Sequence, residues 1–196
     1  MRIITGISRG TKLDTLDGDA TRPTTEMAKE GIFSSIQFDL EGRRVLDLFA
    51  GCGQLGLEAV SRGAESCVFI DNAPAAVEIV KKNAQKTKLF SACKVSCMDY
   101  TEYLKSISGK NVVFDYIFID PPYALGLCPE AVKKIFKSGC IHDGSLIFCE
   151  SDSPDFDLNV INNSVFGKAE IVKQYKYGKT YVHVLRRAAV GGVENE

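Results

Sequence analysis

The chain has 196 residues, 45% of them hydrophobic, which is enough to bury one core. Length favours a single domain over residues 1–187, followed by a tail at 188–196 that we expect to be disordered. No apolar run approaches the roughly 20 residues that a membrane-spanning helix needs, and the N-terminus lacks a signal-peptide pattern, so we expect a cytoplasmic protein.

Seven cysteines occur in the chain, without a C-x-x-C pair. Most of them lie in apolar, strand-like runs, and their number is odd. We therefore interpret them as small buried hydrophobic residues in a reducing compartment, and we predict neither a metal site nor a disulfide framework.

Residues 1–40 are predicted to form a small hairpin and a helix appended to the main sheet. Two short extended pieces, Arg2–Ile7 and Lys12–Leu13, are separated by a glycine-containing turn. Apolar residues then recur at helical spacing from Ala28 to Ile36, after Pro23. Arg22 therefore lies just ahead of a helix N-terminus.

From residue 43 onward, buried strands alternate with amphipathic helices. The alternation predicts the α/β class, with a doubly wound, Rossmann-like and mostly parallel sheet. Two more strand-like runs, joined by a turn that contains Gly178, predict a closing hairpin and an antiparallel last strand. The predicted strands are 44–50, 66–71, 93–98, 114–120, 145–150, 170–175 and 180–187, and the predicted helices are 55–62, 74–84, 102–107 and 130–138.

Positive charge collects in the last hairpin, although the formal net charge of the chain is only −1. Between Gly167 and Arg187 there are six basic residues against one acid, and tyrosines are interleaved with them. Such a run is often just a solvated face. The interleaved aromatic residues favour an anionic partner.

The sequence Asp120-Pro121-Pro122-Tyr123 closes the apolar run 114–119. Proline has no N–H to continue a strand ladder, so the strand stops there. The carbonyl groups of Asp120 and Pro121 are then available to accept hydrogen bonds, next to an aromatic ring. This cluster of acceptors suits a planar group that bears an amino nitrogen, and the four residues are the predicted catalytic set.

Each of the first four predicted strands carries an aspartate at its carboxyl end. In an open doubly wound sheet, ligands bind beyond these ends, where the strand order reverses. We therefore expect the four carboxylates to line one cleft. They are Asp47, Asp71, Asp99 and Asp120.

The segment 51–56 matches G-x-G-x-x-G, and Asp71 follows Gly51 by twenty residues, which also fits a dinucleotide-binding fingerprint. Asp47 argues against NAD, because its charge would oppose a pyrophosphate in the same loop. A cofactor with an ammonium and a sulfonium group would be attracted instead, which indicates S-adenosylmethionine.

In this interpretation the bare backbones of Gly51 and Gly53 admit the methionine moiety, and Asp71 accepts hydrogen bonds from the ribose hydroxyls. Asp99 and the backbone near Met98 would take the adenine amino group; an N-cap role for Asp99 is the simpler alternative. The full predicted cofactor-binding set is Arg22, Asp47, Phe49, Gly51, Gly53, Asp71, Asn72, Met98 and Asp99.

Taken together, these motifs resemble the RsmD family, the bacterial 16S ribosomal RNA guanine-N2 methyltransferases of class I, over nearly the whole chain. Three positions depart from the family pattern: Cys52 where Ser is usual, Asp71 where Glu is common, and Ser34 where Asn is typical. The segments that carry the resemblance are 22–24 with the following helix, 47–53, 55–59, 61–64, Asp71 and 120–123.

The resemblance implies a mechanism. Asp120 and the Pro121 carbonyl would accept both N–H groups of guanine N2 and direct its lone pair at the sulfonium methyl, while Tyr123 stacks on a flipped base. Ribosomal RNA, within a small-subunit particle or an assembly intermediate, would be the partner.

Four alternatives stay open. The proline turn is shared with adenine-N6 methyltransferases of DNA or RNA, and a related turn occurs in protein-glutamine enzymes. The chain could also be a non-catalytic RNA-binding module with a nucleoside pocket, or a Rossmann oxidoreductase.

Overall fold

The computed structural model describes residues 1–16, 23–122 and 126–189. Within these ranges the strands form one seven-stranded sheet in the order β3-β2-β1-β4-β5-β7-β6. The first five strands are parallel, and β7 runs antiparallel to both β5 and β6. The strands are β1 (Arg44–Asp47), β2 (Ser66–Asp71), β3 (Cys93–Cys97), β4 (Phe114–Ile119), β5 (Ile141–Ser151), β6 (Ala169–Tyr177) and β7 (Thr180–Arg187).

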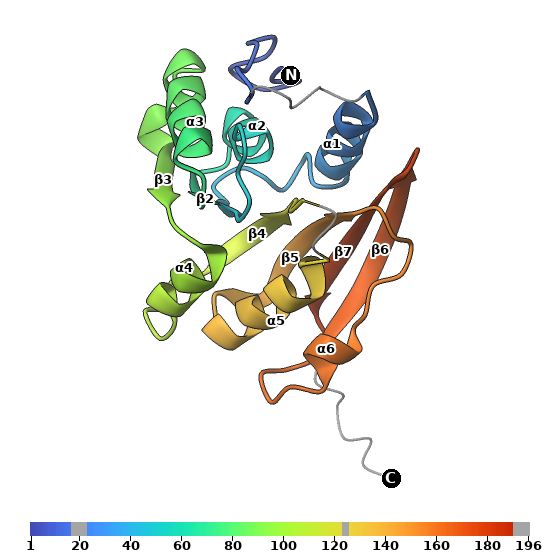
Figure 1. Cartoon of the computed structure of the whole chain (residues 1–196). Coiled ribbons are helices and arrows are strands. Elements are labelled where there is room, and N and C mark those ends of the chain that lie inside the picture. The colour runs from blue at the N-terminus through green and yellow to red at the C-terminus, as the bar shows by residue number, and fades with distance from the viewer. Residues whose placement is uncertain (17–22, 123–125, 190–196) are drawn as a thin grey trace.

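Helices cover both faces of this sheet (Figure 1). Side chains of α1, α2 and α3 belong to one buried cluster, and those of α4, α5 and α6 belong to the cluster on the opposite face. The predicted doubly wound α/β sheet with an antiparallel last strand is confirmed. The helices are α1 (Pro23–Ser35), α2 (Gln54–Ser61), α3 (Pro74–Lys86), α4 (Tyr100–Ile107), α5 (Cys128–Ser138) and α6 (Asn159–Asn162), with a short 3-10 turn at Phe90–Ala92.

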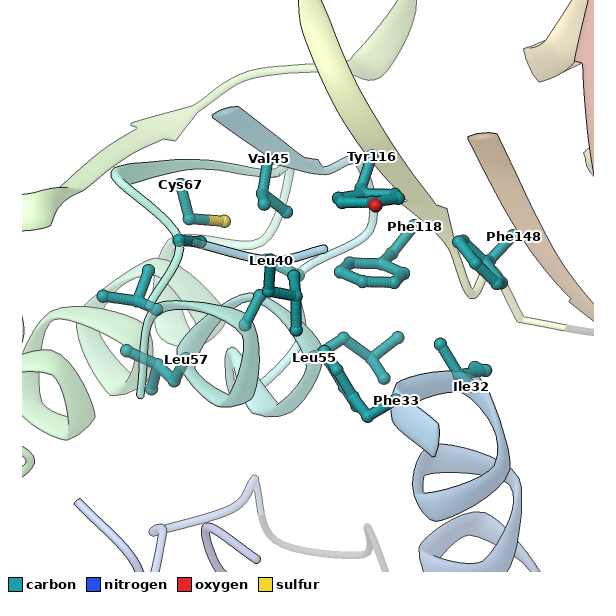
Figure 2. Close-up of a cluster of buried hydrophobic side chains, with 14 of the residues drawn as sticks. Ile32, Phe33, Leu40, Val45, Leu55, Leu57, Cys67, Tyr116, Phe118 and Phe148 are labelled. Carbon is teal, nitrogen blue, oxygen red and sulfur yellow. The ribbon is translucent and has the colours of Figure 1, made fainter. Parts of the chain in front are cut away.

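An aromatic row joins α1 to the middle of the sheet (Figure 2). The ring centroids of Phe33 and Phe118 lie 5.5 Å apart, and those of Phe118 and Phe148 lie 5.6 Å apart. All three side chains are almost completely buried. The row therefore ties α1 to β4 and β5, close to the carboxyl ends of these two strands.

Some boundaries differ from the prediction. The fifth strand begins at Ile141 and not at residue 145, and the first ends at Asp47 and not at residue 50. The early start of β5 goes with a register shift against β4 between Phe114 and Tyr116. Of the predicted disordered tail, Ala188 still donates a backbone hydrogen bond to Lys168 (2.8 Å), and residues 190–196 lie outside the described ranges.

The predicted N-terminal hairpin is reduced to one antiparallel bridge between Arg2 and Lys12. The segment is held by the buried carboxylate of Glu58 on α2, which accepts hydrogen bonds from the backbone N–H groups of Ile4 (2.8 Å) and Thr5 (2.9 Å). The side chain of Glu58 thus accepts backbone hydrogen bonds that a longer strand ladder would otherwise accept. Across the described part of the chain, none of the helices is both long and apolar enough to traverse a bilayer.

Candidate active site

The strand order reverses between β1 and β4, because the chain passes from β1 outward to β2 and β3 and then returns to the other side of β1. Ligand sites of doubly wound sheets lie at such a point, beyond the carboxyl ends of the strands. Asp47 and Asp71 end β1 and β2, whereas Asp99 and Asp120 follow β3 and β4 within two residues. The structure thus brings the four predicted aspartates to one edge of the sheet.

The glycine turn after β1 has the backbone that its sequence predicts. Gly51 and Gly53 have φ angles of 53° and 80°, in the left-handed region that favours glycine. A Cβ atom at Gly51 would meet no atom within 4 Å, so this side of the turn is open to a ligand. A Cβ atom at Gly53 would lie 3.3 Å from Leu57 and Val80, so this glycine also serves the packing of α2 against α3.

Asp71 connects the glycine turn to the end of β2. Its Oδ2 atom accepts a hydrogen bond from the backbone N–H of Gly51 (2.8 Å), and its Oδ1 atom accepts one from Ala73 (2.9 Å). Each carboxylate oxygen has a second lone pair, and the side chain is only partly buried. Asp71 therefore fixes the turn and keeps acceptor capacity for a ligand, with the exposed Asn72 beside it.

Asp47 lies deeper than the sequence suggested. The residue is 1% exposed, and its Oδ2 atom accepts a hydrogen bond from the backbone N–H of Gly56 in the first turns of α2 (3.0 Å). Burial raises the pKa of this carboxyl group to about 7, and the nearby charge of Asp71 adds to the rise, while the bond from Gly56 opposes it. The observed partner of Asp47 is the helix that follows the turn, and its contact with a cofactor stays a prediction.

The turn after β3 places Asp99 at the N-terminus of α4. Its Oδ1 atom accepts a hydrogen bond from the backbone N–H of Thr101 (2.7 Å), which is the N-cap role that the sequence left open. The backbone N–H of Met98 donates to the carbonyl of Asp71 (3.0 Å), which holds the two turns together. The rings of Phe49 and Tyr100 lie 5.0 Å apart in the same region. Sequence reasoning missed Tyr100, although an aromatic residue directly after a strand-end acid was a usable signal.

Strand β4 ends at Ile119, directly before the Asp120-Pro121-Pro122 turn, as predicted for a proline-terminated strand. Asp120 is partly buried, Pro121 is buried and Pro122 is exposed. Tyr123 and Arg22, which belong to the predicted catalytic and cofactor-binding sets, lie outside the described residues.

A further acid at this edge, besides the four aspartates, was missed by sequence reasoning. Glu150, near the end of β5, is 5% exposed, and it follows Cys149, which pairs in register with Ile119 of β4. The signal in the sequence was the charged residue that closes the apolar run 146–149. Its meaning depends on β5 lying next to β4, which the sequence alone does not establish.

A doubly wound sheet of this strand order, with an antiparallel β7 between β5 and β6 and with a glycine turn and a proline turn at its switch point, defines a class I methyltransferase. Solved structures agree with this class. The protein described as "Putative methyltransferase yhhF from Escherichia coli" superposes with a TM-score of 0.79 at 28% identity, covering 95% of this chain and 97% of that one. The protein described as "putative methylase HI0767 from Haemophilus influenzae" gives a TM-score of 0.76 at 28% identity, covering 95% of this chain and 98% of that one.

The sequence comparisons identify the family. The family model described as "Conserved hypothetical protein 95" matches residues 1–186. A Bacillus subtilis protein named "Putative rRNA methyltransferase YlbH" is 33% identical over 187 residues, which is 95% of this chain and 99% of that protein. "Ribosomal RNA small subunit methyltransferase D" of Escherichia coli is 33% identical over 152 residues, covering 78% and 75%. The chain therefore belongs to this family, that of the RsmD methyltransferases, as its motifs indicated.

Proposed function

We propose that the protein transfers a methyl group from S-adenosylmethionine to the exocyclic N2 of a guanine in 16S ribosomal RNA. The observation that carries the proposal is the Asp120-Pro121-Pro122 turn at the switch point, one strand away from the open glycine turn of β1. Relatives from Escherichia coli and Haemophilus influenzae named as ribosomal RNA small subunit methyltransferases support the RNA substrate.

The residues at this edge fit S-adenosylmethionine. The open side of Gly51 leaves room for the methionine part, and the remaining lone pairs of Asp71 suit ribose hydroxyls. Asp99 still has one carboxylate oxygen beyond the bond to Thr101, and the pair of Phe49 and Tyr100 offers apolar ring surface near it. When bound, the cofactor supplies an electrophilic methyl group.

The contribution of the chain is mainly positioning and electrostatics. The lone pair of guanine N2 is delocalised into the ring, so the nitrogen is a poor nucleophile. Asp120 and the Pro121 carbonyl would each accept one N2–H, which favours a pyramidal nitrogen whose lone pair points at the methyl group. N2 would use its lone pair to form the new N–C bond, and the electron pair of the C–S bond would stay with sulfur. N2 then loses a proton, which has become acidic, to Asp120 or to water.

Tyr123 is proposed to stack on the flipped base, and Arg22 to contact the cofactor. The exposed lysines of the β6–β7 hairpin would bind RNA phosphates without regard to sequence. We further propose that the protein acts in the cytoplasm, on a small-subunit particle or an assembly intermediate.

Transfer of radiolabelled methyl groups tests the proposal. Small-subunit particles that lack guanine-N2 methylation are incubated with the protein and labelled S-adenosylmethionine, and the RNA is digested for nucleoside mass spectrometry. We expect N2-methylguanosine. Label found only on adenine would assign the shared proline turn to N6 chemistry, and label found only on protein would exclude RNA as the substrate.

A further inference from the structure

Glu150 lies next to Asp120 across the boundary between β4 and β5. Ile119 and Cys149 pair in register in the two parallel strands, so Asp120 and Glu150 occupy the next positions. Side chains alternate along a strand, and the neighbouring rings of Phe118 and Phe148, two positions earlier, lie on the α1 face of the sheet (Figure 2). Alternation therefore places Glu150 on this same face, and Asp120 is the first residue after β4, at the neighbouring position.

The backbone at Glu150 is held by β7 and by α5. β5 lies between β4 and β7, and Glu150 pairs in register with Val182 of β7. The thiol of Cys128, at the start of α5, lies 3.4 Å from the carbonyl oxygen of Glu150. A carboxylate on such a central strand is positioned more sharply than one on a loop, which is what discrimination between similar bases requires.

The proposed chemistry leaves one donor of guanine without an acceptor. The Watson–Crick edge of guanine presents N1–H beside the two N2–H groups, and Asp120 and the Pro121 carbonyl account only for those on N2. Adenine presents an acceptor at its N1. A carboxylate beside Asp120 would, when ionised, only accept hydrogen bonds, and it would therefore favour guanine over adenine.

We propose that Glu150 accepts the N1–H of the target guanine and so determines specificity for guanine over adenine. The inference rests on the proposed function and deepens it, because the proline turn alone is common to enzymes of both bases. The glutamate side chain is one methylene longer than that of Asp120, so from the adjacent strand it reaches the ring nitrogen next to N2. Sites built to hydrogen-bond a donor reject analogues that lack it by large factors.

The test uses 2-aminopurine, which keeps the amino group of guanine but has an acceptor at N1. Particles are reconstituted with ribosomal RNA that carries either guanine or 2-aminopurine at the target position, and single-turnover methyl transfer is measured on both. For the unaltered protein we expect guanine to react on the order of a hundredfold faster. Equal rates of methyl transfer to guanine and to 2-aminopurine by the unaltered protein would by themselves overturn the inference.

Glu150→Gln then separates specificity from a structural role. A glutamine amide can donate to the N1 of 2-aminopurine, so the preference for guanine should fall about tenfold or more. If the variant slows both substrates equally, Glu150 supports the fold only, and the inference is wrong. The control is Glu130→Gln on α5, a position whose side chain is 45% exposed and pairs with Lys134, and it should leave the ratio unchanged. Failure of the unaltered protein to methylate N2 of ordinary guanine would instead refute the proposed function.

Discussion

Asp47 and Asp71 end neighbouring strands, but only Asp71 reaches the surface of the site. The two residues differ in burial because α2 packs closely on the sheet at Gly56. A Cβ atom at Gly56 would come within 2.3 Å of the Phe69 ring, so only glycine allows this close packing. This close approach brings the Gly56 N–H to Asp47 and covers the carboxyl group. The sequence predicts an acid at each strand end, but the burial of one of them results from packing between distant segments.

Asp47 should make stability fall as pH rises from about 4 to about 7. The unfolded chain loses the proton near the ordinary pKa of 3.8, and the folded chain keeps it until about 7, so between these values the folded state binds more protons. The stabilising contribution is complete below pH 3.8 and is lost as pH approaches 7. Three pKa units correspond to about 4 kcal/mol at most.

Urea unfolding of the unaltered protein and of Asp47→Asn, at pH 4.5 and pH 8, checks this. The variant cannot ionise at this position, and its amide oxygen can still accept the bond from Gly56. Relative to the unaltered protein it should therefore gain stability toward pH 8. A difference between the two proteins that does not depend on pH would contradict the assignment.

Asp120→Asn tests the acceptor at the proline turn. The amide keeps the shape of the side chain but presents donors as well, so the amino nitrogen can no longer be held by two full acceptors. Methyl transfer should fall on the order of a hundredfold or more, whereas S-adenosylmethionine affinity should change little. Asp115→Asn is the matched control, because this residue lies at the other end of β4 and pairs with Arg43 and His142. Full activity of Asp120→Asn would refute the site.

At the scale of elements, the N-terminal segment shows what local pattern cannot supply. The two extended pieces and the turn of this segment were predictable. The segment is attached to the rest of the protein by Glu58, and the helical pattern of the sequence predicts only that Glu58 lies on α2, not that it binds the N-terminal backbone. The buried carboxylate lies 3.3 Å from the Lys29 ammonium and 2.8 Å from Nε of Arg62. Lys29 also donates to the carbonyl of Arg2 (2.7 Å), and burial lowers its pKa despite the attraction of Glu58.

Glu58→Gln should therefore destabilise the fold by roughly 3–5 kcal/mol, because it leaves the buried Lys29 ammonium without its counter-charge. Chemical denaturation measures the loss. Glu78→Gln removes an exposed partner of Lys81 on α3 and should cost less than about 0.5 kcal/mol. If the two variants are equally stable, the Glu58 cluster does not anchor the segment.

The basic residues of the β6–β7 hairpin include one that pairs with an acid within the hairpin and several that are exposed to solvent. Arg186 pairs with Glu170 (2.6 Å), but the lysines near the turn are exposed, with the Lys173 ammonium 4.9 Å from the centre of the Tyr175 ring and that of Lys176 5.3 Å from the centre of the Tyr181 ring. The turn lies at the carboxyl end of β5, beside α1 (Figure 1). Of the six basic residues counted in the sequence, the exposed lysines near the turn, Lys173, Lys176 and Lys179, are therefore the ones we expect to bind RNA phosphates.

Replacing Lys173, Lys176 and Lys179 by alanine should weaken RNA binding and flatten its salt dependence. Each phosphate contact contributes roughly 0.7–0.9 to the slope of log affinity against log salt, so the slope should fall by about 2 to 3. Filter binding over a salt series measures it. The control replaces three lysines of α5 by alanine, which changes the charge by the same amount on the face of the sheet opposite to α1. These lysines are Lys133, Lys134 and Lys137. Equal effects of the two triple variants would mean that only net charge matters.

For the whole molecule, the alternation of strands and helices was predictable because strands and helices differ in their hydrophobic period and several of them end next to a glycine, a proline or a strand-end acid. The start of β5 was missed, because His142-Asp143-Gly144 has the composition of a turn. There the His142 N–H bonds to Ser145 Oγ (2.9 Å), and the register shift absorbs the irregularity. Strand order was not predictable from the sequence either. For this reason the sequence could not show that Asp120 and Glu150 lie next to each other.

Strand order also decides between the two cofactors that the glycine motif allows. With β2 on one side of β1 and β4 on the other, a ligand at the glycine turn lies between the carboxylate of Asp71 and the Asp120 proline turn. Each nearby charge changes binding by about 1–4 kcal/mol near a protein surface, with opposite sign for a cation and an anion. The sulfonium and ammonium groups of S-adenosylmethionine are attracted, and the pyrophosphate of NAD is repelled. Calorimetry should therefore give a dissociation constant at least about a hundredfold lower for S-adenosylmethionine, a difference of about 2.7 kcal/mol. Tight binding of NAD without a response to S-adenosylmethionine would show that the acids at this edge do not select the cofactor by charge.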